Sequence, residues 1–438
     1  MTNNIFKRTS FMALAVMAAT PLFAGDKAVN WWYESANPGQ QEALSTHLID
    51  KFNASDKDHN LIIDYRGDAL TQQLRVALLS GTGPDLVQTP GPAFVAAMAR
   101  AGQLLPLDDI AASKGWNDRI LPFFLDLGRF DGKLYALPKT YETLGLFYNK
   151  KVMSDNGWKV PTTIKDFEKV ADQMVAKGIV PIGAGNSNWR PANEWHVTLA
   201  MNSIAGPDNM QKALTGQMSW TEQPFVDSVN ALKRWWDKGY FGENYFSIST
   251  EQMISNLAEG ISAMAPTGSW SFGDVPTYFE GQLDNVGFAG FPSGEGVPYP
   301  IYALGIGTTF SIASKAENPE GAAAALDFMF DEGFYTDINN VWQGEWNLPL
   351  RDLSNVKLSD DVLPAYTASM AALASAVNNN QYGYTSWTFM PPATNSYVVS
   401  GIEEVWLDEI TTEQFLSELD AIFTQELAEG KVADIPAR

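Results

Sequence analysis

The sequence predicts an α/β fold with two lobes, each built on a mainly parallel β-sheet flanked by helices. Short apolar runs alternate with amphipathic helical segments near the start of the chain, and the alternation restarts after about residue 150. The chain has 438 residues, which is too long for one ordinary hydrophobic core, so two domains are expected.

The composition is that of a globular, strongly acidic protein. Hydrophobic residues make up 45% and charged residues 18% of the chain, and the formal net charge is −22. Such a charge repels nucleic acids and anionic membrane surfaces, so neither is expected as a partner.

Residues 1–24 are predicted to be a signal peptide. Lys7 and Arg8 precede an apolar run, residues 11–19, that is too short to span a bilayer, and a small-residue cleavage site ends at Ala24. The sequence contains no cysteine, so neither disulfides nor a lipid-modified N-terminal cysteine is expected. We therefore expect export to the periplasm as an untethered protein.

The N-terminal part of the mature chain alternates strands and helices. A helix with an apolar face of Leu44, Leu48, Ile49 and Phe52 follows the first strand, and another contains Leu70, Leu74, Ala77 and Leu78. Gly102, at a position suited to positive φ, ends a third. The order βαβαβα implies a mainly parallel sheet with right-handed crossovers. The segments are strands Val29–Tyr33, Leu61–Tyr65 and Asp85–Gln88, and helix Pro92–Arg100.

The stretch Leu134–Lys150 is predicted to lead from one lobe to the other. Its two apolar runs, Leu134–Leu137 and Leu144–Tyr148, suggest two strands with an irregular connection around Pro138. We expect Tyr141 and Glu142 to lie at the mouth of the cleft between the lobes, with Tyr141 in contact with ligand and Glu142 as a hydroxyl acceptor.

The second half of the chain repeats the alternation. Asn318 is expected to cap a helix that begins at Pro319, and Thr411 with Gln414 is expected to form a capping box. The expected strands are Ile179–Ile182, Ile261–Ala265, Val286–Phe291 and a β-rich run Gly305–Ala313; the expected helices are Thr163–Lys177, Pro191–Ile204, Glu222–Lys238 and Glu251–Glu259.

Motifs for enzymatic chemistry are missing. His47, His59 and His196 match no zinc spacing, and the stretch 305–310 lacks the third glycine of a dinucleotide fingerprint. The stretch 269–273 has Ser where a nucleophile elbow needs its first Gly. The chain has 51 acidic residues, which form many pairs by chance, so spacing alone identifies no catalytic pair of carboxylates. We expect no catalytic residues, no metal and no cofactor.

Tryptophan gives the most informative pattern. The chain has 14 of them, and several fall in predicted loops after strands, where ligands of open parallel sheets bind. An aromatic ring stacks on the apolar face of a sugar, and neighbouring carboxylates and amides read its hydroxyls. Core packing is the alternative for each, and it is the expected role of at least one of Trp235 and Trp236, and of Trp406. The loop tryptophans are Trp31, Trp32, Trp189, Trp270, Trp342, Trp346 and Trp387.

The sequence resembles family 1 extracellular solute-binding proteins, the maltose-binding-type periplasmic components of sugar ABC importers. The resemblance lies in motifs that follow the family's order over nearly the whole mature chain. These are residues 78–87 (LLSGTGPDLV), 102–107 (GQLLPL), 132–138 (GKLYALP), 146–150 (LFYNK), 260–264 (GISAM), 268–270 (GSW) and 318–323 (NPEGAA).

The resemblance implies a two-lobed type II periplasmic binding protein joined by hinge strands. Three crossings would fall near Pro138–Tyr141, Ala289–Ser293 and Gly344–Asn347. The N-terminal lobe would comprise residues 25–138 and 292–344, and the C-terminal lobe residues 139–291 and 345–438.

The resemblance and the aromatic pattern together give a predicted ligand-binding set, in which the pair Trp31 and Trp32 resembles the glucose/mannose-binding branch. The set comprises Trp31, Trp32, Glu34, Gln88, Gly91, Tyr141, Asn188, Trp189, Trp270, Trp346 and Trp387.

We therefore expect a monomeric carbohydrate-binding protein that delivers its ligand to a membrane-embedded ABC permease. The many aromatics favour an oligosaccharide over a monosaccharide. Lys139 and Arg190 would suit a uronate, but surface positions are expected for both. The alternatives are a secreted glycan lyase or hydrolase with an aromatic-lined cleft, and a ligand-loaded sensor that docks on a chemoreceptor.

Overall fold

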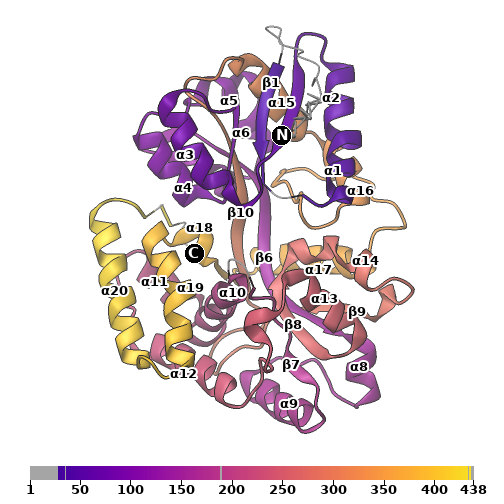
Figure 1. The fold of residues 1–438 in the computed structure, drawn as a ribbon, viewed down its shortest axis with the longest axis vertical. Coiled ribbons are helices and arrows are strands. Elements are labelled where there is room, and N and C mark those ends of the chain that lie inside the picture. The colour runs from indigo at the N-terminus through magenta and orange to yellow at the C-terminus, as the bar shows by residue number, and fades with distance from the viewer. Residues whose placement is uncertain (1–27, 35, 188–189, 433, 436–438) are drawn as a thin grey trace, which may run out of the picture.

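The computed structural model describes residues 28–34, 36–187, 190–432, 434 and 435. The predicted signal peptide, residues 1–24, lies outside the described residues. These form two lobes stacked along the long axis, and strands β6 and β10 run through the junction (Figure 1). The predicted α/β architecture is confirmed. In the described part of the chain, no helix is long and apolar enough to cross a membrane.

One nine-stranded sheet passes through both lobes in the order β2-β1-β3-β10-β6-β8-β7, with β11 beside β10 and β9 beside β6. A separate small hairpin joins β4 to β5. The strands are β1 (Ala28–Tyr33), β2 (Asn60–Tyr65), β3 (Leu86–Thr89), β4 (Arg129–Phe130), β5 (Lys133–Leu134), β6 (Leu137–Asn149), β7 (Val180–Ile182), β8 (Ser262–Gly268), β9 (Val286–Ala289), β10 (Tyr302–Ile312) and β11 (Tyr382–Tyr384).

The upper lobe in Figure 1 has the predicted βαβαβα order. Strand β1 pairs in parallel with β2 and β3, because each crossover helix returns the chain in the same direction. Gly102 ends the third helix with φ +67°, as predicted. The helices of this lobe are α1 (Pro38–Leu44), α2 (Asp50–Ser55), α3 (Leu70–Ser80), α4 (Pro92–Arg100), α5 (Asp108–Lys114), α6 (Trp116–Arg119), α7 (Pro122–Asp126), α15 (Pro319–Met329) and α16 (Glu332–Val341).

The lower lobe contains most of the remaining helices, and α19 and α20 pack together at its side (Figure 1). The capping box of Thr411 and Gln414 opens α20, and the Asn318 side chain caps α15 in the upper lobe, both as predicted. The helices are α8 (Lys150–Asp155), α9 (Ile164–Ala176), α10 (Pro191–Ala200), α11 (Pro207–Leu214), α12 (Gln223–Asp237), α13 (Thr250–Glu259), α14 (Val275–Tyr278), α17 (Pro364–Asn378), α18 (Ser386–Phe389), α19 (Pro392–Trp406) and α20 (Thr412–Ala428).

Strand β6 is one continuous strand of 13 residues, so the prediction of two strands with an irregular connection was wrong. Its first part, residues 137–144, pairs with residues 303–310 of β10 on both sides of the junction, and its second part pairs with β8 and β9. Pro138 interrupts the sequence pattern but not the strand. It lies opposite Thr309, next to a register shift in β10 that accommodates the missing N–H.

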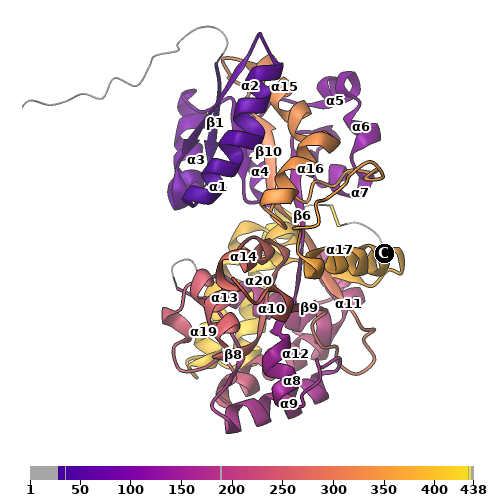
Figure 2. The same cartoon turned by 90° about the vertical axis from the view of Figure 1, so that its right-hand side faces the viewer.

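The contacts also bear on where the chain crosses between lobes. Ser293 N donates to Thr162 O (3.0 Å) and Gly294 N to Ser203 O (2.7 Å), and both acceptors belong to the lower lobe. Strand β10 instead passes upward at the register shifts between Ile306 and Thr309. We therefore propose that the second crossing lies within β10 and not at the expected Ala289–Ser293. Figure 2 shows β6 and β10 bridging the narrow junction.

Candidate functional site

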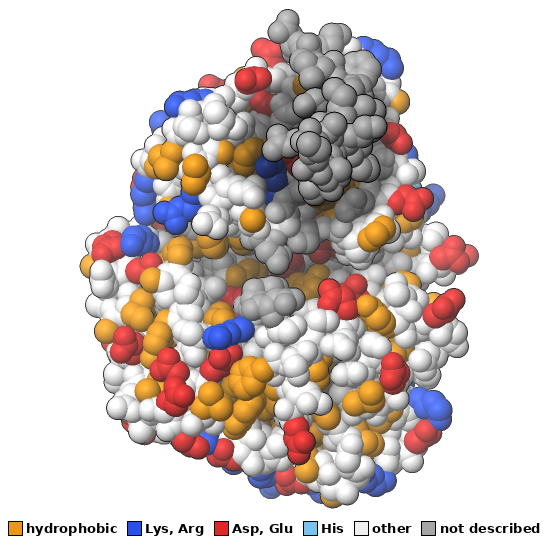
Figure 3. Space-filling model, viewed as in Figure 1, with side chains coloured by type: hydrophobic (Ala, Val, Ile, Leu, Met, Phe, Trp, Pro, Cys, Tyr) orange, Lys and Arg blue, Asp and Glu red, His pale blue; other side chains and the backbone are white. Residues whose placement is uncertain are grey.

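The candidate site lies where the two lobes face each other beside the hinge strands. The surface is hollowed along this line, with acidic and apolar side chains in the hollow (Figure 3). The lobes approach closely at Gly91, just before α4: a Cβ there would lie 3.4 Å from the Trp387 carbonyl oxygen of the lower lobe. The aromatic and acidic groups described next come from both sides of this junction.

Three indoles of the lower lobe form an aromatic cluster. Trp270 follows β8 in the short helical turn Ser269–Gly273, and its ring lies 5.3 Å from Trp195 and 5.9 Å from Trp387. Gly268 makes room for it, since a Cβ at that position would lie 2.0 Å from the Trp270 ring. Trp270 and Trp387 stay partly exposed, and the buried Nε1 of Trp387 has no hydrogen-bond acceptor. Partly exposed rings with a free donor suit a ligand that has both apolar faces and hydroxyls.

The upper lobe contributes an amide and a carboxylate. Gln88 in β3 is 1% exposed, and its Nε2 donates to Glu34 Oε1 at 2.7 Å. Its Oε1 is buried without a donor. Burial raises the pKa of Glu34, and the charge of Glu345 adds to this, while Lys139 opposes it. The pair therefore offers unused acceptors beside the junction.

Lys139 forms a buried ion pair with Glu345. Its Nζ also lies 3.5 Å from the Tyr33 hydroxyl and 4.8 Å from the centre of the Trp346 ring. Burial opposes the charge, but Glu345 outweighs it and the pKa of Lys139 is raised. The expectation of a surface position is wrong for Lys139, which is 0% exposed. It is confirmed for Arg190, whose side chain is 51% exposed and pairs with Glu403.

Glu142 lies at the centre of the hinge. Its carboxylate occupies the space over Gly307, where a Cβ would lie 1.6 Å from Oε1. Burial raises the pKa of Glu142 well above its ordinary value, and the charge of Glu345 raises it further. No described residue donates a hydrogen bond to this carboxylate, so among the described residues this buried acid has no hydrogen-bond donor.

Glu194 is a further buried acid, in the first turn of α10. Ser386 Oγ donates to its Oε1 at 3.0 Å, and burial raises its pKa to about 7. Sequence reasoning missed Glu194 and Trp195, because the stretch Pro191–Ile204 was predicted only as a helix and no residue in it was assigned a role. All ten residues of α10 are buried.

Two predicted contacts lie in the core of the upper lobe. Trp31 and Trp346 are both 0% exposed, with their rings 6.4 Å apart. Side chains alternate along a strand, so Trp31 faces the helices of this core and Trp32 the opposite side. Trp32 is partly exposed beneath the Arg66 guanidinium, 3.9 Å from its ring centre. This burial argues against direct ligand contact for Trp31 and Trp346.

Tyr141 is half-buried at the lobe boundary. Its backbone N–H donates to Asn347 O (2.9 Å), which ties the first crossing to the third, and its ring lies 5.5 Å from Phe124. Asn188 and Trp189 lie outside the described residues. No group of three His, Cys, Asp or Glu side chains in the described part of the chain could hold a metal ion.

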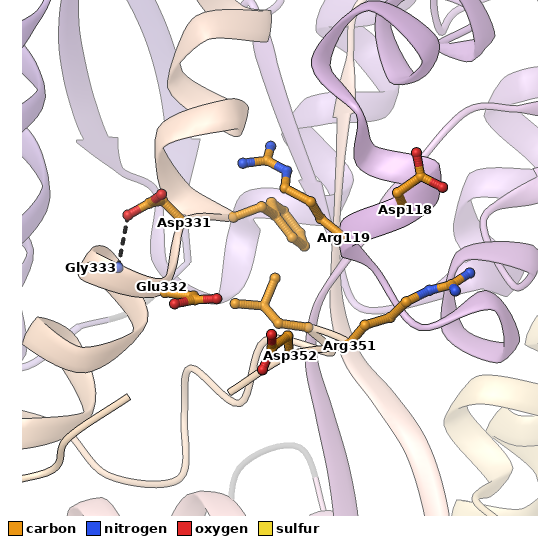
Figure 4. A pocket seen from close by; sticks show the side chains of 9 residues that line it. Asp118, Arg119, Asp331, Glu332, Gly333, Arg351 and Asp352 are labelled. Atoms are coloured by element: carbon orange, nitrogen blue, oxygen red, sulfur yellow. Dashed lines mark hydrogen bonds between the residues drawn. The ribbon is translucent and has the colours of Figure 1, made fainter. Parts of the chain in front are cut away.

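A well-formed surface cavity of about 360 Å³ lies elsewhere, in the upper lobe near the start of α16. Figure 4 shows it surrounded by charged side chains, including Arg119, Arg351 and Asp331. Arg119 pairs with Asp327, and Arg351 Nε donates to Ile120 O at 3.1 Å. These groups are engaged with the protein, and the cavity lies apart from the aromatic cluster.

Comparison with known proteins gives a family and a fold. The profile of the bacterial extracellular solute-binding protein family matches residues 35–336. A probable sugar-binding periplasmic protein of Rhizobium meliloti (strain 1021) is 25% identical over 287 residues, 61% of this chain and 64% of the relative. The chain spans about two thirds of the length of the curated relatives it matches, 66%, 64% and 63% for three of them.

Solved structures share the fold at low sequence identity. A chitin oligosaccharide binding protein superposes with a TM-score of 0.78 at 22% identity, covering 92% of this chain and 100% of that one. A bacterial solute receptor, AcbH, with a preference for β-D-galactopyranose superposes with a TM-score of 0.76 at 16% identity, covering 92% and 99%.

Proposed function

The chain belongs to the family of bacterial extracellular solute-binding proteins, and from this premise we propose that it captures a sugar between its lobes and delivers it to the permease of an ABC importer. The name of the Rhizobium meliloti relative, a probable sugar-binding periplasmic protein, supports a carbohydrate ligand. We propose binding without covalent chemistry.

The observation that carries the proposal is the partly exposed pair Trp270 and Trp387 beside the hinge, 5.9 Å apart and nearly edge to face. Two rings at such an angle can cover two faces of a sugar or two consecutive rings. The unpaired Oε1 of Gln88 and the unpaired Nε1 of Trp387 would pair with hydroxyls, and the Glu142 carboxylate would accept from others.

The proposed contacts form two groups. Those beside the described junction are Glu34, Gln88, Gly91, Tyr141, Glu142, Trp270 and Trp387. Those that rest on the sequence pattern and the family resemblance are Trp32, Asn188 and Trp189. We assign Trp31 and Trp346 a supporting role, because they pack against each other beneath this surface.

An oligosaccharide is proposed over a monosaccharide, since Trp270 and Trp387 are two separate, partly exposed rings and a single sugar ring needs only one. A chitin oligosaccharide binding protein shares the fold. The fold also serves the galactopyranose-preferring receptor, so the evidence for chain length is the aromatic surface and not the fold.

Ligand capture would shift the lobes toward the closed state. A sugar held by Gln88 above and Trp270 below binds the closed arrangement more tightly than the open one, and the equilibrium moves by that difference in affinity. The permease would then recognise the closed form. We propose that the mature chain begins after residue 24 and acts as a monomer in the periplasm.

The proposal is tested by a thermal-shift screen of the purified protein against neutral mono- and oligosaccharides of one to six units, followed by calorimetry of each hit. A ligand that binds only the folded state at 100 times its Kd adds about 2.7 kcal/mol of stability. Release of shorter sugars from an oligosaccharide, lost on Glu142→Gln, would instead indicate a glycan-active enzyme.

A further inference from the structure

The hinge gathers more carboxylates than it can neutralise. Four charged side chains, from both lobes and from four separate segments of the chain, influence the pKa of Glu142. Only one of these side chains is basic. These groups are Glu34, Lys139, Glu194 and Glu345. Because β6 and β10 carry the chain between the lobes at this point, the excess negative charge lies where a ligand would be enclosed.

The basic side chains near the cleft already have carboxylate partners. Lys139 is fully buried against Glu345. Arg190 pairs with Glu403 at 3.1 Å, and Arg66 with Asp64. An anionic ligand would therefore have to share one of these cations with a carboxylate or displace that carboxylate, and both are costly at a buried site.

Two buried acceptors point independently to a donor-rich ligand. Gln88 is 1% exposed and its Oε1 has no donor. Glu142 is 7% exposed, and no described residue donates a hydrogen bond to its carboxylate. A buried unsatisfied acceptor such as Gln88 Oε1 is rare inside proteins and is expensive to leave empty. An ammonium group supplies three hydrogen-bond donors and a positive charge, so it suits a cleft that has an unpaired acceptor and an excess of carboxylates.

We propose that the cleft selects its sugar by charge, binding an amine-bearing sugar more tightly than the neutral sugar, and the neutral sugar more tightly than the corresponding uronate. This inference rests on the proposed function. A cation near Glu142 stabilises its ionised form, whereas an anion meets the neighbouring carboxylates, whose charge adds to burial in raising the pKa of Glu142. Binding of the amine should release protons, and binding of the neutral sugar should not.

The direct test is calorimetry at pH 7 with matched series: glucosamine, glucose and glucuronate; galactosamine, galactose and galacturonate; and chitosan tetraose against cellotetraose. We expect at least a tenfold higher affinity for the amine than for the uronate within any series that binds. Heats of amine binding should vary with the ionisation enthalpy of the buffer. Equal or tighter binding of a uronate would overturn the proposal.

Variants locate the effect. Glu142→Gln should reduce the amine-to-neutral affinity ratio at least fivefold and abolish proton release, since it removes the ionising group. Glu280→Gln, an exposed acid of the same lobe, is the matched control and should leave the ratio unchanged. An unchanged ratio in Glu142→Gln contradicts the proposed role of Glu142.

A measurement without sugar separates this inference from the sugar-binding function. The difference in tryptophan fluorescence between the wild type and Trp270→Phe reports on the cleft. At pH 8 and equal ionic strength, caesium ions should quench this difference signal more strongly than iodide ions. If no sugar binds but caesium is preferred, the charge inference holds and the sugar ligand fails. If iodide quenches equally or better, the charge inference fails, whatever the ligand.

Discussion

We propose Trp270 as the residue that stacks on the sugar ring, because it is partly exposed while two neighbouring indoles fix its orientation. Trp270→Ala should lower sugar affinity at least 30-fold, corresponding to about 2 kcal/mol for loss of a central tryptophan contact. Calorimetry measures the affinity, and the melting temperature of the sugar-free protein reports on the fold.

Trp158→Ala is the matched control for that experiment. Trp158 is also partly exposed, but it lies in the loop between α8 and α9, where its Nε1 donates to Gln173 at 2.8 Å. Its loss should affect stability and leave affinity within twofold of the wild type. Similar affinities in the two variants would remove Trp270 from the site.

His196 carries a pH prediction. It is buried beside Phe241, 4.8 Å between ring centres, and burial lowers its pKa to about 3. Unfolded imidazole takes up a proton below about pH 6.5, so the unfolded state binds more protons between pH 3 and 6.5. The stability contributed by neutral His196 is therefore present above pH 6.5 and lost as the pH falls.

His196→Phe removes this titration while keeping a ring in the core. The free energy of unfolding of the variant, relative to wild type, should rise by about 2 kcal/mol between pH 7 and pH 5, at about 1.4 kcal/mol per pH unit below 6.5. Urea denaturation at the two pH values measures it. Phe241→Leu perturbs the same packing but removes no titrating group, so its free energy of unfolding should differ from that of the wild type by the same amount at both pH values. A difference that is also independent of pH for His196→Phe would contradict the prediction.

Sequence reasoning reached the lower-lobe aromatics more readily than the charged hinge. Trp270 could be predicted because it follows a strand, and the strand-end rule points to the cleft. The same rule misplaces Trp31, since alternation along β1 turns this ring into the core. Lys139 could not be recognised as buried, because its partner Glu345 lies 206 positions away in sequence.

At the scale of elements, the cap of α15 joins three parts of the upper lobe. The Asn318 Oδ1 accepts from Gly321 N at 2.9 Å, its Nδ2 donates to Ala28 O at 3.2 Å, and its N–H donates to Asp85. Asn318→Ala should lower the free energy of unfolding by about 2 kcal/mol, the upper end for a helix cap. Thr411→Ala, at the exposed cap of α20, should lower the free energy of unfolding by only about 1 kcal/mol. Urea denaturation measures both, and a smaller decrease for Asn318→Ala than for Thr411→Ala would contradict the prediction.

The hinge strands depend on a close fit between Glu142 and Gly307. Because a Cβ at Gly307 would lie 1.6 Å from the Glu142 carboxylate, Gly307→Ala should lower the free energy of unfolding by about 1–3 kcal/mol through overpacking. In a Glu142→Ala background, Gly307→Ala should lower the free energy of unfolding by at most half as much, since the carboxylate no longer occupies the space over residue 307. Thermal denaturation of the four proteins measures this coupling, and equal losses in both backgrounds would refute it.

Most elements could be predicted because their signals are local. The caps at Asn318 and Thr411 and the stop at Gly102 act within one helical turn. The continuity of β6 could not be predicted, because the local sequence around Pro138 indicates the end of a strand. The proline is accommodated by the register shifts of β10, which lies more than 150 residues later in the chain. The position of the second crossing depends on the same distant pairing.

For the whole molecule, lobe closure should be limited by the contact at Gly91. A Cβ there would lie 3.4 Å from the Trp387 carbonyl and 3.5 Å from that of Ile306, so a methyl group fits but a larger side chain does not. Gly91→Leu should hold the lobes apart and lower sugar affinity at least tenfold, because binding must then proceed from a less closed state.

Small-angle scattering provides the conformational readout. With saturating sugar, the wild-type protein should show a smaller radius of gyration than without it, whereas Gly91→Leu should keep the larger value at the same sugar occupancy. Gly91→Ala is the control for loss of glycine itself and should close nearly as far as the wild type. If Gly91→Leu closes fully, the lobes meet elsewhere, and its loss of affinity would then have to come from direct contact with the ligand and not from the closure equilibrium.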